Sequence, residues 1–484
     1  MQDPISSREH FHLRIVDLKI EDVAFGGKGV GRENGKAVFV PFTIDGEMIS
    51  AQITREKKQF AEAEVVDLQE RSPHRVNPEC PYFGRCGGCS YQHIDYEHQL
   101  AIKWRQVRDV LQRIGKFKDI PMRPIIPSPI SYAYRNRITV HAQDGMIGFF
   151  RRDSHRLIDI ERCPISLDEV NQALTGLRVR APRDGHYTLR AQSGPRVFSQ
   201  ANDTVANALR DLIARLIPGD QELLIDAYCG AGFFAKALLD KFERILGIDW
   251  DKFAIEAARE NATAKETYIA GDIEEELIRA QVGEVDALSP ESYSGTGRTA
   301  RGQLGSIALT FQKEKTTLIV DPPATGLTAK TRRAIADLAP GTFIYVSCNP
   351  PTLARDLAEL QQSFTIDSVT PLDMFPQTAE IEVAVHLRTA SALASRLETS
   401  RITFPRRKSQ PSFNKRPSRR NSDFSAPACE RSATQPASRP TPLGRDYLLD
   451  PTVHSDNTRR LPEESQCYIS ILGIRPSRFC ARVW

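Results

Sequence analysis

The stretch from Leu223 to Asp249 constrains the fold of this chain more than any other. It contains a strand-like run (LLIDA), a glycine-rich turn (YCGAG), a helical stretch and a second strand-like run (ILGID). This order places small residues at the carboxyl end of one strand and an acid at the end of the next, as nucleotide-binding α/β folds require. The sequence therefore predicts a doubly wound, Rossmann-like α/β domain with a ligand site at one edge of its sheet.

The turn itself favours one class of ligand. Its pattern, D-x-x-C-G-x-G, differs from the G-x-G-x-x-G of dinucleotide sites and favours S-adenosylmethionine over NAD. Gly230 and Gly232 let the backbone approach the cofactor, and Asp249 is expected to accept from its ribose hydroxyls. Asp272 is positioned for the adenine end, although an Asp here is also typical of a helix N-cap, and both roles are compatible.

A single cysteine, Cys348, ends another apolar run. It follows TFIYVS and precedes Asn349-Pro350, where the proline stops the strand. Glu380 and Glu382 lie in a later strand-like run, whose two-residue period places both carboxylates on one face. Cys348 is a candidate nucleophile and the two acids are candidate bases, although a lone cysteine after a strand is also compatible with a buried structural thiol.

Several motifs occur in an order that resembles the bacterial RNA (uracil-5-)-methyltransferase family, between about residues 10 and 388. The resemblance implies that Cys348 is the nucleophile and that Glu382, rather than Glu380, is the base. It also implies that Gln200, Tyr228, Asp249 and Asp321 line the pocket for the cofactor and the target base. The motifs are FSQAN at 198–202, DAYCGAG at 226–232, VDPP at 320–323, VSCNP at 346–350 with LARD at 353–356, and DMFP at 373–376.

Two positions depart from the family pattern. Phe233 stands where a polar residue is usual, and Ala324 follows Asp321-Pro322-Pro323 where an arginine is common. Neither position makes or breaks a bond. The departures therefore put the fine geometry of the pocket and its target contacts in doubt, and leave the expected reaction unchanged.

The implied reaction explains the residue types. Carbon 5 of uracil is a poor nucleophile until a thiolate adds to carbon 6, and a free thiol, with a pKa of about 8.5, is mostly protonated at neutral pH. We therefore expect the pocket to activate Cys348. Glu382 would then remove the carbon 5 proton so that the thiol can leave. Asp321 is expected to hydrogen-bond the uracil edge or the cofactor, unless it only initiates a turn.

Four of the nine cysteines have a spacing typical of metal ligands. Cys80, Cys86 and Cys89 form C-x5-C-x2-C, and Cys163 supplies a fourth thiol. Four thiolates suit a [4Fe-4S] cluster or a tetrahedral zinc ion, and the spacing alone does not choose. The family resemblance implies the [4Fe-4S] cluster, in a structural role. Because the cysteines do not form a secreted disulfide pattern and no run of membrane length occurs, we expect a cytoplasmic protein that does not contact a membrane.

The sequence divides into four segments. Residues 1–70 form an all-β module whose GGKGVGRENGKAVFV followed by DGE resembles a TRAM domain, an OB-like RNA-binding barrel, although a generic β module is an alternative. Residues 71–196 form a central segment with the cluster cysteines, and residues 197–388 the methyltransferase domain. Within the latter, residues 283–308 are expected to be a loop. Residues 389–484 are expected to be a disordered basic tail.

Charge is distributed unevenly along the chain. The net charge is +4 overall, −4 over residues 1–70, +9 over residues 101–196 and +9 over residues 391–484. The central arginines alternate with aromatics, which fits phosphate contact and base stacking, although a solvated sheet face is an alternative. We therefore expect the central segment to be the main RNA surface. The tail either adds nonspecific RNA affinity or is foreign to the catalytic unit.

The sequence predicts a monomeric enzyme that methylates carbon 5 of a uridine in structured RNA. The barrel and the cysteine motif together favour ribosomal RNA, and the same reaction on transfer RNA is the alternative. A DNA cytosine-5 methyltransferase shares the thiolate chemistry, but the RNA-type barrel and the order of Cys348 before Glu382 argue against it. A noncatalytic RNA-binding or redox-sensing iron–sulfur protein would leave Cys348, Glu382 and the glycine turn unexplained.

Overall fold

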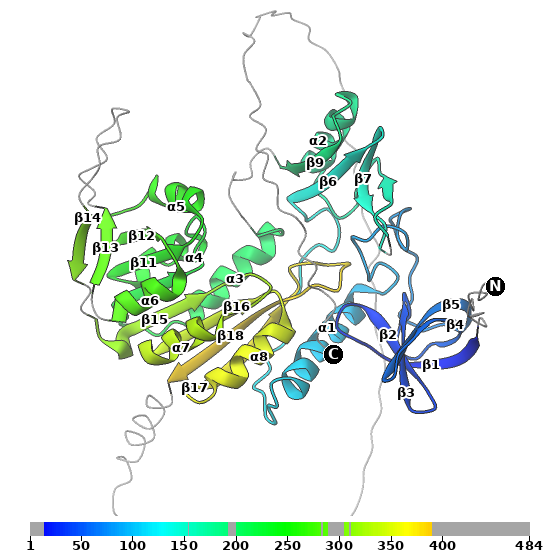
Figure 1. The fold of residues 1–484 in the computed structure, drawn as a ribbon, viewed down its shortest axis with the longest axis horizontal. Coiled ribbons are helices and arrows are strands. Elements are labelled where there is room, and N and C mark those ends of the chain that lie inside the picture. The colour runs from blue at the N-terminus through cyan, green and yellow to red at the C-terminus, as the bar shows by residue number, and fades with distance from the viewer. Residues whose placement is uncertain are drawn as a thin grey trace, which may run out of the picture. The chain divides into compact units, whose positions relative to one another are not determined.

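The structure is a computed structural model of the chain. The expected tail and the motif residues Phe198 and Ser199 lie outside its described residues, and of 284–288 and 304–308 only the backbone is described. Among the helices of the described part, none combines the length and apolar character needed to cross a bilayer. Figure 1 shows the described residues in colour: 14–152, 154–191, 200–281, 284–288, 304–308 and 311–389.

Five strands near the N-terminus close into a barrel in the order β1-β2-β3-β5-β4. Alternate residues point inward, so that Leu18, Ile20, Val38 and Val40 are fully buried in its core. The predicted β-barrel is confirmed. The strands are β1 (Ile15–Val23), β2 (Lys28–Glu33), β3 (Lys36–Pro41), β4 (Met48–Glu56) and β5 (Phe60–Glu70).

Only parts of the glycine-rich segment between β1 and β3 are turns. Gly26 and Gly27 form the turn with φ of 93° and 88°, and strand β2 already begins at Lys28. A Cβ on Gly31 would lie 2.9 Å from the carbonyl oxygen of Lys19 on β1. Gly31 therefore serves close strand packing, whereas Gly35, with a φ of 82°, turns the chain between β2 and β3.

A four-stranded antiparallel sheet, in the order β8-β7-β6-β9, forms the central part of the described chain. Ile138, Val140 and Leu189 on one face pack with Val170 and Leu174 of helix α2. Figure 1 shows α2 along one side of this sheet. The elements are β6 (Arg137–Gln143), β7 (Met146–Phe150), β8 (Leu157–Asp159), α2 (Asp168–Val179) and β9 (Gly185–Arg190).

A seven-stranded sheet confirms the predicted doubly wound α/β fold. Its order is β12-β11-β10-β15-β16-β18-β17, with the first five strands parallel and β18 antiparallel to both neighbours. Strands β10 and β15 are buried along their whole length, as parallel strands covered on both faces are. The strands are β10 (Leu223–Ala227), β11 (Arg244–Asp249), β12 (Glu266–Ala270), β15 (Thr316–Val320), β16 (Thr342–Ser347), β17 (Phe364–Leu372) and β18 (Glu382–Thr389).

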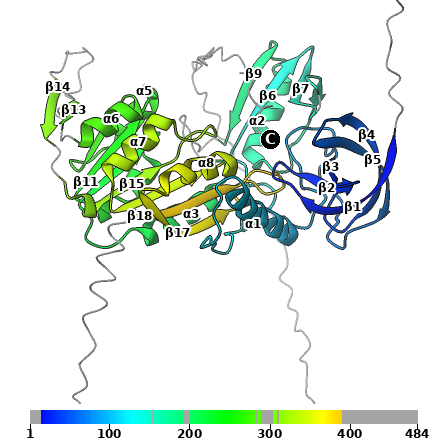
Figure 2. The same ribbon diagram turned by 60° about the horizontal axis from the view of Figure 1, so that its bottom comes forward.

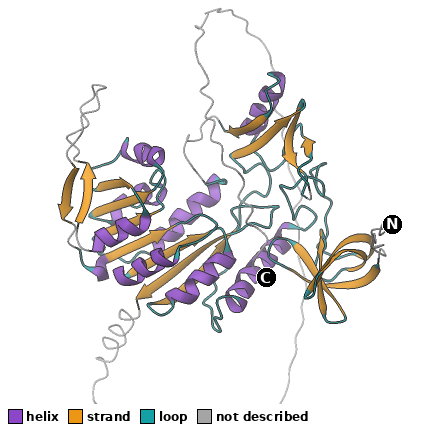
Figure 3. Cartoon of the chain, in the orientation of Figure 1, coloured by secondary structure: helices purple, strands orange, loops and turns teal. Residues whose placement is uncertain are grey.

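Helices cover both faces of this sheet (Figures 2 and 3). Helices α6, α7 and α8 contribute to one core, and α3, α4 and α5 to the other. Helix α1, from the central segment of the sequence, also packs into the first core through Val107, Val110 and Leu111. The helices are α1 (Tyr96–Arg113), α3 (Asp203–Leu216), α4 (Phe233–Ala237), α5 (Lys252–Arg259), α6 (Ile273–Gln281), α7 (Ala329–Leu338) and α8 (Pro350–Leu360).

The sequence had suggested that residues 283–308 form a loop. The structure instead places two paired strands within them. Strands β13 (Glu284–Leu288) and β14 (Leu304–Ala308) pair antiparallel, with Val285 opposite Ile307. β-Branched residues favour strands, and the Ser- and Gly-rich composition of the whole segment obscured these two short runs. Residues 289–303 between the strands lie outside the described part.

Candidate active site

Five predicted site residues gather at one edge of the seven-stranded sheet. Tyr228, Asp321 and Cys348 directly follow the parallel strands β10, β15 and β16, and Asp249 is the last residue of β11. The carboxyl ends of parallel strands meet at one edge, where open α/β folds bind their ligands. Glu382 joins them because it is the first residue of the antiparallel strand β18.

The register of β16 and β18 brings the candidate nucleophile and base together. Ser347 pairs with Val383, so the next residue outward on β16 is Cys348 and the next on β18 is Glu382. Cys348 is half-buried and Glu382 is buried, with 3% of its surface exposed. The carboxyl Oε1 of Glu382 has no hydrogen-bond partner among the described residues. A buried acceptor without a partner, beside a thiol, leaves a position for a substrate atom.

The Cys348 thiol is not activated by its surroundings alone, contrary to expectation. Burial raises its pKa to about 12, and the negative charges of Glu382 and Asp321 oppose ionisation further. Burial also raises the pKa of Asp321 to about 7. Because the pocket disfavours free ionisation of Cys348, the thiol has to transfer its proton to a neighbouring group for a thiolate to form.

Glu380 and Glu382 do not share one strand face, so the alternation argument from sequence is wrong. Strand β18 begins only at Glu382, and Glu380 lies exposed in the preceding loop. Burial, together with the charges of Asp321 and Glu380, raises the pKa of Glu382 well above its ordinary value. A raised pKa makes the carboxylate of Glu382 a stronger proton acceptor, and its burial distinguishes Glu382 from the exposed Glu380.

Gln200 reaches Asp321 from outside the sheet. Its Nε2 donates to Asp321 Oδ2 over 3.3 Å, and its backbone carbonyl accepts from Asn136 Nδ2 at 2.8 Å. Gln200 is buried and lies just before the N-cap of α3, Asn202. The structure thus brings the predicted residues Gln200 and Asp321 into contact, with Asn136 as a support that sequence reasoning did not identify.

The glycine-rich turn adopts the conformation that its sequence requires. Tyr228, Gly230 and Gly232 have φ of 64°, 54° and 83°, a region that favours glycine. The N–H of Gly230 donates to Asp249 Oδ2 at 2.8 Å, and the N–H of Asp251 donates to Oδ1 at 2.9 Å. Asp249 therefore also fixes the turn, because it joins the ends of β10 and β11.

Asp272 performs the helix-capping role that was left open. It is exposed, and its Oδ1 accepts from the N–H groups of Glu274 at 2.9 Å and Glu275 at 3.2 Å, in the first turn of α6. Its contact with an adenine remains a prediction.

Asp226 is a buried carboxyl that sequence reasoning missed. It is fully buried in β10, and its Oδ2 accepts from the N–H of Ala235 in α4 at 3.0 Å. Burial raises its pKa to about 8, and the charges of Asp321 and Asp249 add to the rise. The signal was available, since Asp226 is the first letter of the DAYCGAG motif.

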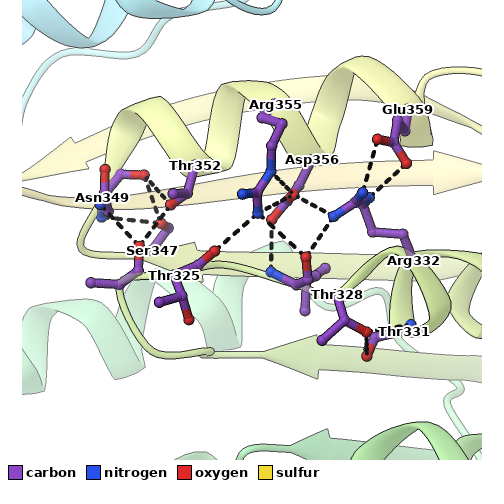
Figure 4. Close-up of polar contacts among 12 residues, drawn as sticks. Thr325, Thr328, Thr331, Arg332, Ser347, Asn349, Thr352, Arg355, Asp356 and Glu359 are labelled. Carbon is purple, nitrogen blue, oxygen red and sulfur yellow. Dashed lines mark hydrogen bonds and ion pairs between the residues drawn. The ribbon is translucent and has the colours of Figure 1, made fainter. Parts of the chain in front are cut away.

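Asp356 organises a second set of contacts that the sequence did not reveal (Figure 4). Its Oδ2 accepts from the N–H of Leu327 and the hydroxyl of Tyr345, each at 2.8 Å. Its Oδ1 accepts from Arg332 at 2.8 Å and from Arg355 Nε at 2.9 Å. A fully buried carboxylate with four donors is held in one position, and it holds α7, α8, β16 and the loop after Asp321 together.

Side chains of helix α8 and of its N-cap residue also donate hydrogen bonds to the loop that follows Asp321. Asn349 Nδ2 and Thr352 Oγ1 donate to the carbonyl of Ala324 at 2.9 and 3.1 Å, and Arg355 donates to the carbonyl of Thr325 at 3.0 Å. Figure 4 shows these side chains on one side of the helix, aimed at the loop. The chain after Asp321 and the chain after Cys348 therefore form one rigid unit.

Gln377 anchors the loop at 373–381, which leads into Glu382. Its carbonyl accepts from the N–H groups of Ser90 and Tyr91, both at 3.0 Å. Gln99 Oε1 accepts from the N–H of Gln377, and Gln99 Nε2 donates to Gln377 Oε1, again at 3.0 Å. These contacts stabilise the positive φ of 68° at Gln377, which is uncommon for a residue with a side chain.

Two further contacts hold the beginning of the same loop. Lys103 Nζ lies 2.6 Å from Asp373 Oδ1 and donates to the carbonyl of Phe375 at 2.9 Å, with both charged side chains fully buried. The hydroxyl of Tyr134 donates to the carbonyl of Pro376 at 3.0 Å. The loop that places Glu382 in the site is thus held by residues of α1 and of the segment before β6.

The four predicted metal-ligand cysteines line one cavity of about 530 Å³. Burial raises the pKa of the Cys80 and Cys86 thiols, and raises that of Cys89 to about 12, with neighbouring thiols adding to each rise. Cys163 lies on the wall of the same cavity. Four thiol donors around one space are the ligand chemistry of a [4Fe-4S] cluster or zinc. The side chains do not converge on a point, however, and no metal-binding group of three or more Cys, His, Asp or Glu occurs within the described residues.

Comparison with known proteins decides the family. Residues 152–390 match the tRNA (Uracil-5-)-methyltransferase family, and residues 11–66 match the TRAM domain. The chain is 31% identical over 405 residues to an uncharacterized RNA methyltransferase of Bdellovibrio bacteriovorus, covering 78% of this chain and 95% of that one. The chain belongs to the tRNA (uracil-5-)-methyltransferase family. A second member, an uncharacterized RNA methyltransferase of Protochlamydia amoebophila, is 30% identical over 455 residues, covering 78% and 99% of the two chains.

A solved structure supports the fold of this tRNA (uracil-5-)-methyltransferase family member. The crystal structure of Pyrococcus abyssi tRNA (uracil-54, C5)-methyltransferase with S-adenosyl-L-homocysteine superposes with a TM-score of 0.53 at 23% identity, covering 77% of this chain and 99% of that one. The family resemblance and the TRAM domain predicted from sequence are confirmed. Family membership and the TRAM domain also support an RNA substrate.

Proposed function

We propose that the chain transfers a methyl group from S-adenosylmethionine to carbon 5 of a uridine in RNA, through a covalent bond between Cys348 and carbon 6. The observation that carries the proposal is the placement of Cys348 and Glu382 on neighbouring antiparallel strands, at the edge that also holds the glycine turn. S-adenosylmethionine supplies an electrophilic methyl group when bound. Tyr228, Gly230, Gly232 and Asp249 form its binding turn, and Asp272 contacts the adenine.

Proton movements follow from the charges at the edge. Because burial opposes free ionisation of Cys348, its proton passes to a neighbouring carboxylate as the sulfur bonds to carbon 6. Asp321, whose pKa is raised to about 7, is the acceptor that is close to half-ionised at neutral pH. The Gln200–Asp321 pair then faces the uracil edge, where amide and carboxyl groups complement its donors and acceptors.

Release of the product requires a base. After carbon 5 has gained the methyl group, Glu382 takes its remaining proton, and the electron pair of that C–H bond re-forms the ring double bond as sulfur leaves. The departing thiolate recovers a proton from Asp321, so that Cys348 ends as it began. Glu382 is suited to this step because it is buried beside Cys348 and its raised pKa makes its carboxylate a stronger proton acceptor.

The RNA class is ribosomal RNA in this proposal, because the barrel and the cysteine motif occur together in one chain. Transfer RNA is the second candidate, favoured by the description of the matched family. Incubation with methyl-labelled S-adenosylmethionine and separate samples of ribosomal RNA, transfer RNA and DNA tests both, followed by mapping of the labelled nucleotide. Label in DNA, or on a base other than uracil, would contradict the proposal.

The four cysteines hold a [4Fe-4S] cluster in this proposal. The support is their common cavity, because four thiols around one space are the ligand chemistry of such a cluster. Their sulfurs have to converge when the cluster binds. Four protein thiolates leave no open coordination position, so the role of the cluster is structural. Anaerobic purification followed by iron analysis tests the assignment.

A further inference from the structure

The outward face of the central sheet carries a strip of polar and aromatic residues across β6 and β9. Ile138, Val140 and Leu189 point inward to α2, so the residues between them along each strand point outward. We call the outward set the β6–β9 strip. It consists of Arg137, Thr139 and His141 on β6 and of His186, Thr188 and Arg190 on β9.

Like residues face one another across the strip. In the antiparallel register Arg137 pairs with Arg190, Thr139 with Thr188 and His141 with His186. The two threonine hydroxyls are 3.1 Å apart and the two imidazole rings 4.4 Å. The two guanidinium groups therefore lie close together, and concentrated positive charge of this kind attracts the phosphates of a nucleic acid.

A third arginine adds to the positive charge at this end of the strip. Burial lowers the pKa of Arg137, and the charges of Arg190 and Arg135 lower it further, which shows that the three guanidinium groups repel one another. Arg135 also lies 6.0 Å from the ring of Phe375, in the loop before Glu382. A fully solvated sheet face would screen such repulsion, whereas these groups are half-buried.

The arginine end of the strip opens into the cavity that the cysteines line. Arg135, Arg137 and Arg190 border this cavity, as do the two threonines of the strip. Glu380 borders it as well, two residues before Glu382. The strip therefore begins beside the chain that carries the proposed base and runs away from it along the sheet.

At the other end of the strip the side chains are aromatic rings, those of His141 and His186. The ring of His141 lies 4.1 Å from that of Phe150, in addition to its contact with His186. Burial lowers the pKa of His141, and the neighbouring His186 lowers it further, so the imidazole is uncharged at neutral pH. Aromatic side chains that follow a cationic groove are the arrangement on which single-stranded nucleic acids stack their bases.

We propose that the β6–β9 strip binds the single-stranded RNA that flanks the target uridine, with a backbone phosphate at Arg135, Arg137 and Arg190 and bases stacked on His141, His186 and Phe150. This assignment rests on the proposed function, because it names the contacts of the same substrate. The charge of the strip and its rings, of which His186 is exposed and His141 and Phe150 are half-buried, complement a phosphate backbone and unpaired bases. A double helix hides its bases from such a surface.

The test measures binding without methylation. A fluorescent oligouridylate is titrated with the full-length Cys348→Ala chain, with no S-adenosylmethionine present, over a range of salt concentrations. Arg137→Gln and Arg190→Gln are expected to weaken binding and to reduce the slope of log affinity against log salt by about 0.7 for each phosphate that the variant no longer binds. His141→Ala and His186→Ala are expected to weaken binding roughly five- to a hundredfold and to leave the salt slope unchanged.

Two controls separate the strip from general charge and from misfolding. Arg183→Gln removes the same charge from an exposed position outside the strip and should keep wild-type affinity. Thermal unfolding of every variant checks that the sheet is intact. Equal losses for Arg183→Gln and Arg137→Gln, or unchanged binding in folded strip variants, would overturn the inference. Because the assay involves no methyl transfer, a chain that binds through the strip but methylates no uridine would contradict only the proposed function.

Discussion

Cys348 and Glu382 lie one residue beyond the same cross-strand pair, Ser347 with Val383, on strands that run in opposite directions. The proposed nucleophile and the proposed base, which are separated in the chain by helix α8 and strand β17, thus share one edge of a sheet. Neighbouring antiparallel strands hold side chains at nearly fixed separations, so this pairing sets the separation of Cys348 and Glu382 before any substrate binds.

Replacement of Cys348 by Ala or Ser should abolish methyl transfer and leave binding of S-adenosylmethionine nearly unchanged. The sulfur bonds only to the base, and a serine hydroxyl in this acidic, half-buried position is a far weaker nucleophile. Transfer of labelled methyl groups and calorimetric titration of the cofactor measure the two effects. In the wild-type chain, RNA containing 5-fluorouridine should form a covalent complex that survives denaturing gels. Methylation by Cys348→Ala would rule out the covalent mechanism.

Glu382→Gln should accumulate a covalent, methylated RNA adduct, because methyl transfer precedes the step that needs the base. Turnover should fall by about 10²- to 10⁴-fold, the usual worth of general-base catalysis. Glu380→Gln is the matched control, since it makes the same change at an exposed loop position, and it should lower the rate much less. Denaturing gels with labelled methyl groups follow the adduct. The reverse order of the two effects would move the base to Glu380.

Asp226 should make the protein less stable as the pH rises. Its pKa is about 8 in the folded protein and about 3.9 in an unfolded chain, so the folded state binds more protons between these values. The free energy of unfolding therefore decreases as the pH rises from about 4 to about 8. Asp226→Asn retains an acceptor for the N–H of Ala235 and should flatten this slope in urea unfolding, whereas Asp240→Asn, at an exposed position, is the control. If the free energy of unfolding of Asp226→Asn fell as steeply with pH as that of the wild type, groups other than Asp226 would cause the pH dependence.

Asp356→Ala should destabilise the chain by about 3 kcal/mol, because it deprives the hydroxyl of Tyr345 and the guanidinium of Arg332 of their shared partner in a buried place. Glu359 provides a matched control, since it pairs with the same guanidinium from a largely exposed position. Glu359→Gln should cost about 1 kcal/mol or less. Urea unfolding at constant pH measures both. Equal effects would mean that burial does not set the strength of this network.

Protein purified without oxygen should be brown and contain about four irons per chain if the cysteines hold the proposed cluster. Replacement of any one of Cys80, Cys86, Cys89 or Cys163 by Ser should remove the iron and destabilise the central part of the chain. Cys229→Ser, at a buried cysteine outside this cavity, should retain it. A colourless protein with one zinc per chain would contradict the iron assignment and leave the Cys348 mechanism unaffected.

The sequence predicted the parts of the site that depend on local pattern. The glycine turn, the strand that ends at Cys348 and the acid at the end of β11 all follow from hydrophobic runs and the residues that stop them. Glu380 and Glu382 were misjudged because alternation applies only inside a strand, and the loop held by Gln377 delays the start of β18. That delay is set by partners far away in the chain.

Tertiary partners also explain what the sequence could not reveal in the rest of the site. Asp356 stood in a recognised motif, but its role depends on Leu327 and Arg332, which no spacing rule links to it. The raised pKa of Cys348 depends in the same way on burial by elements that meet only in the folded chain. The glycines of strand β2 do not by themselves indicate a strand, and only the packing of Gly31 against β1 explains one of them.

The hydrogen bonds from Ser90 and Tyr91 to Gln377 link the seven-stranded sheet to residues far upstream in the chain. The sheet can therefore be complete as a fold and still lack contacts that the proposed reaction needs. A fragment that starts at Gln200 would keep all seven strands, yet it would lack the residues that hold the loop before Glu382. Such a fragment is expected to bind S-adenosylmethionine and to leave RNA unmethylated, which calorimetry and a labelling assay would show. Substitutions at Ser90 or Tyr91 can therefore move the proposed base without altering any strand of the seven-stranded sheet.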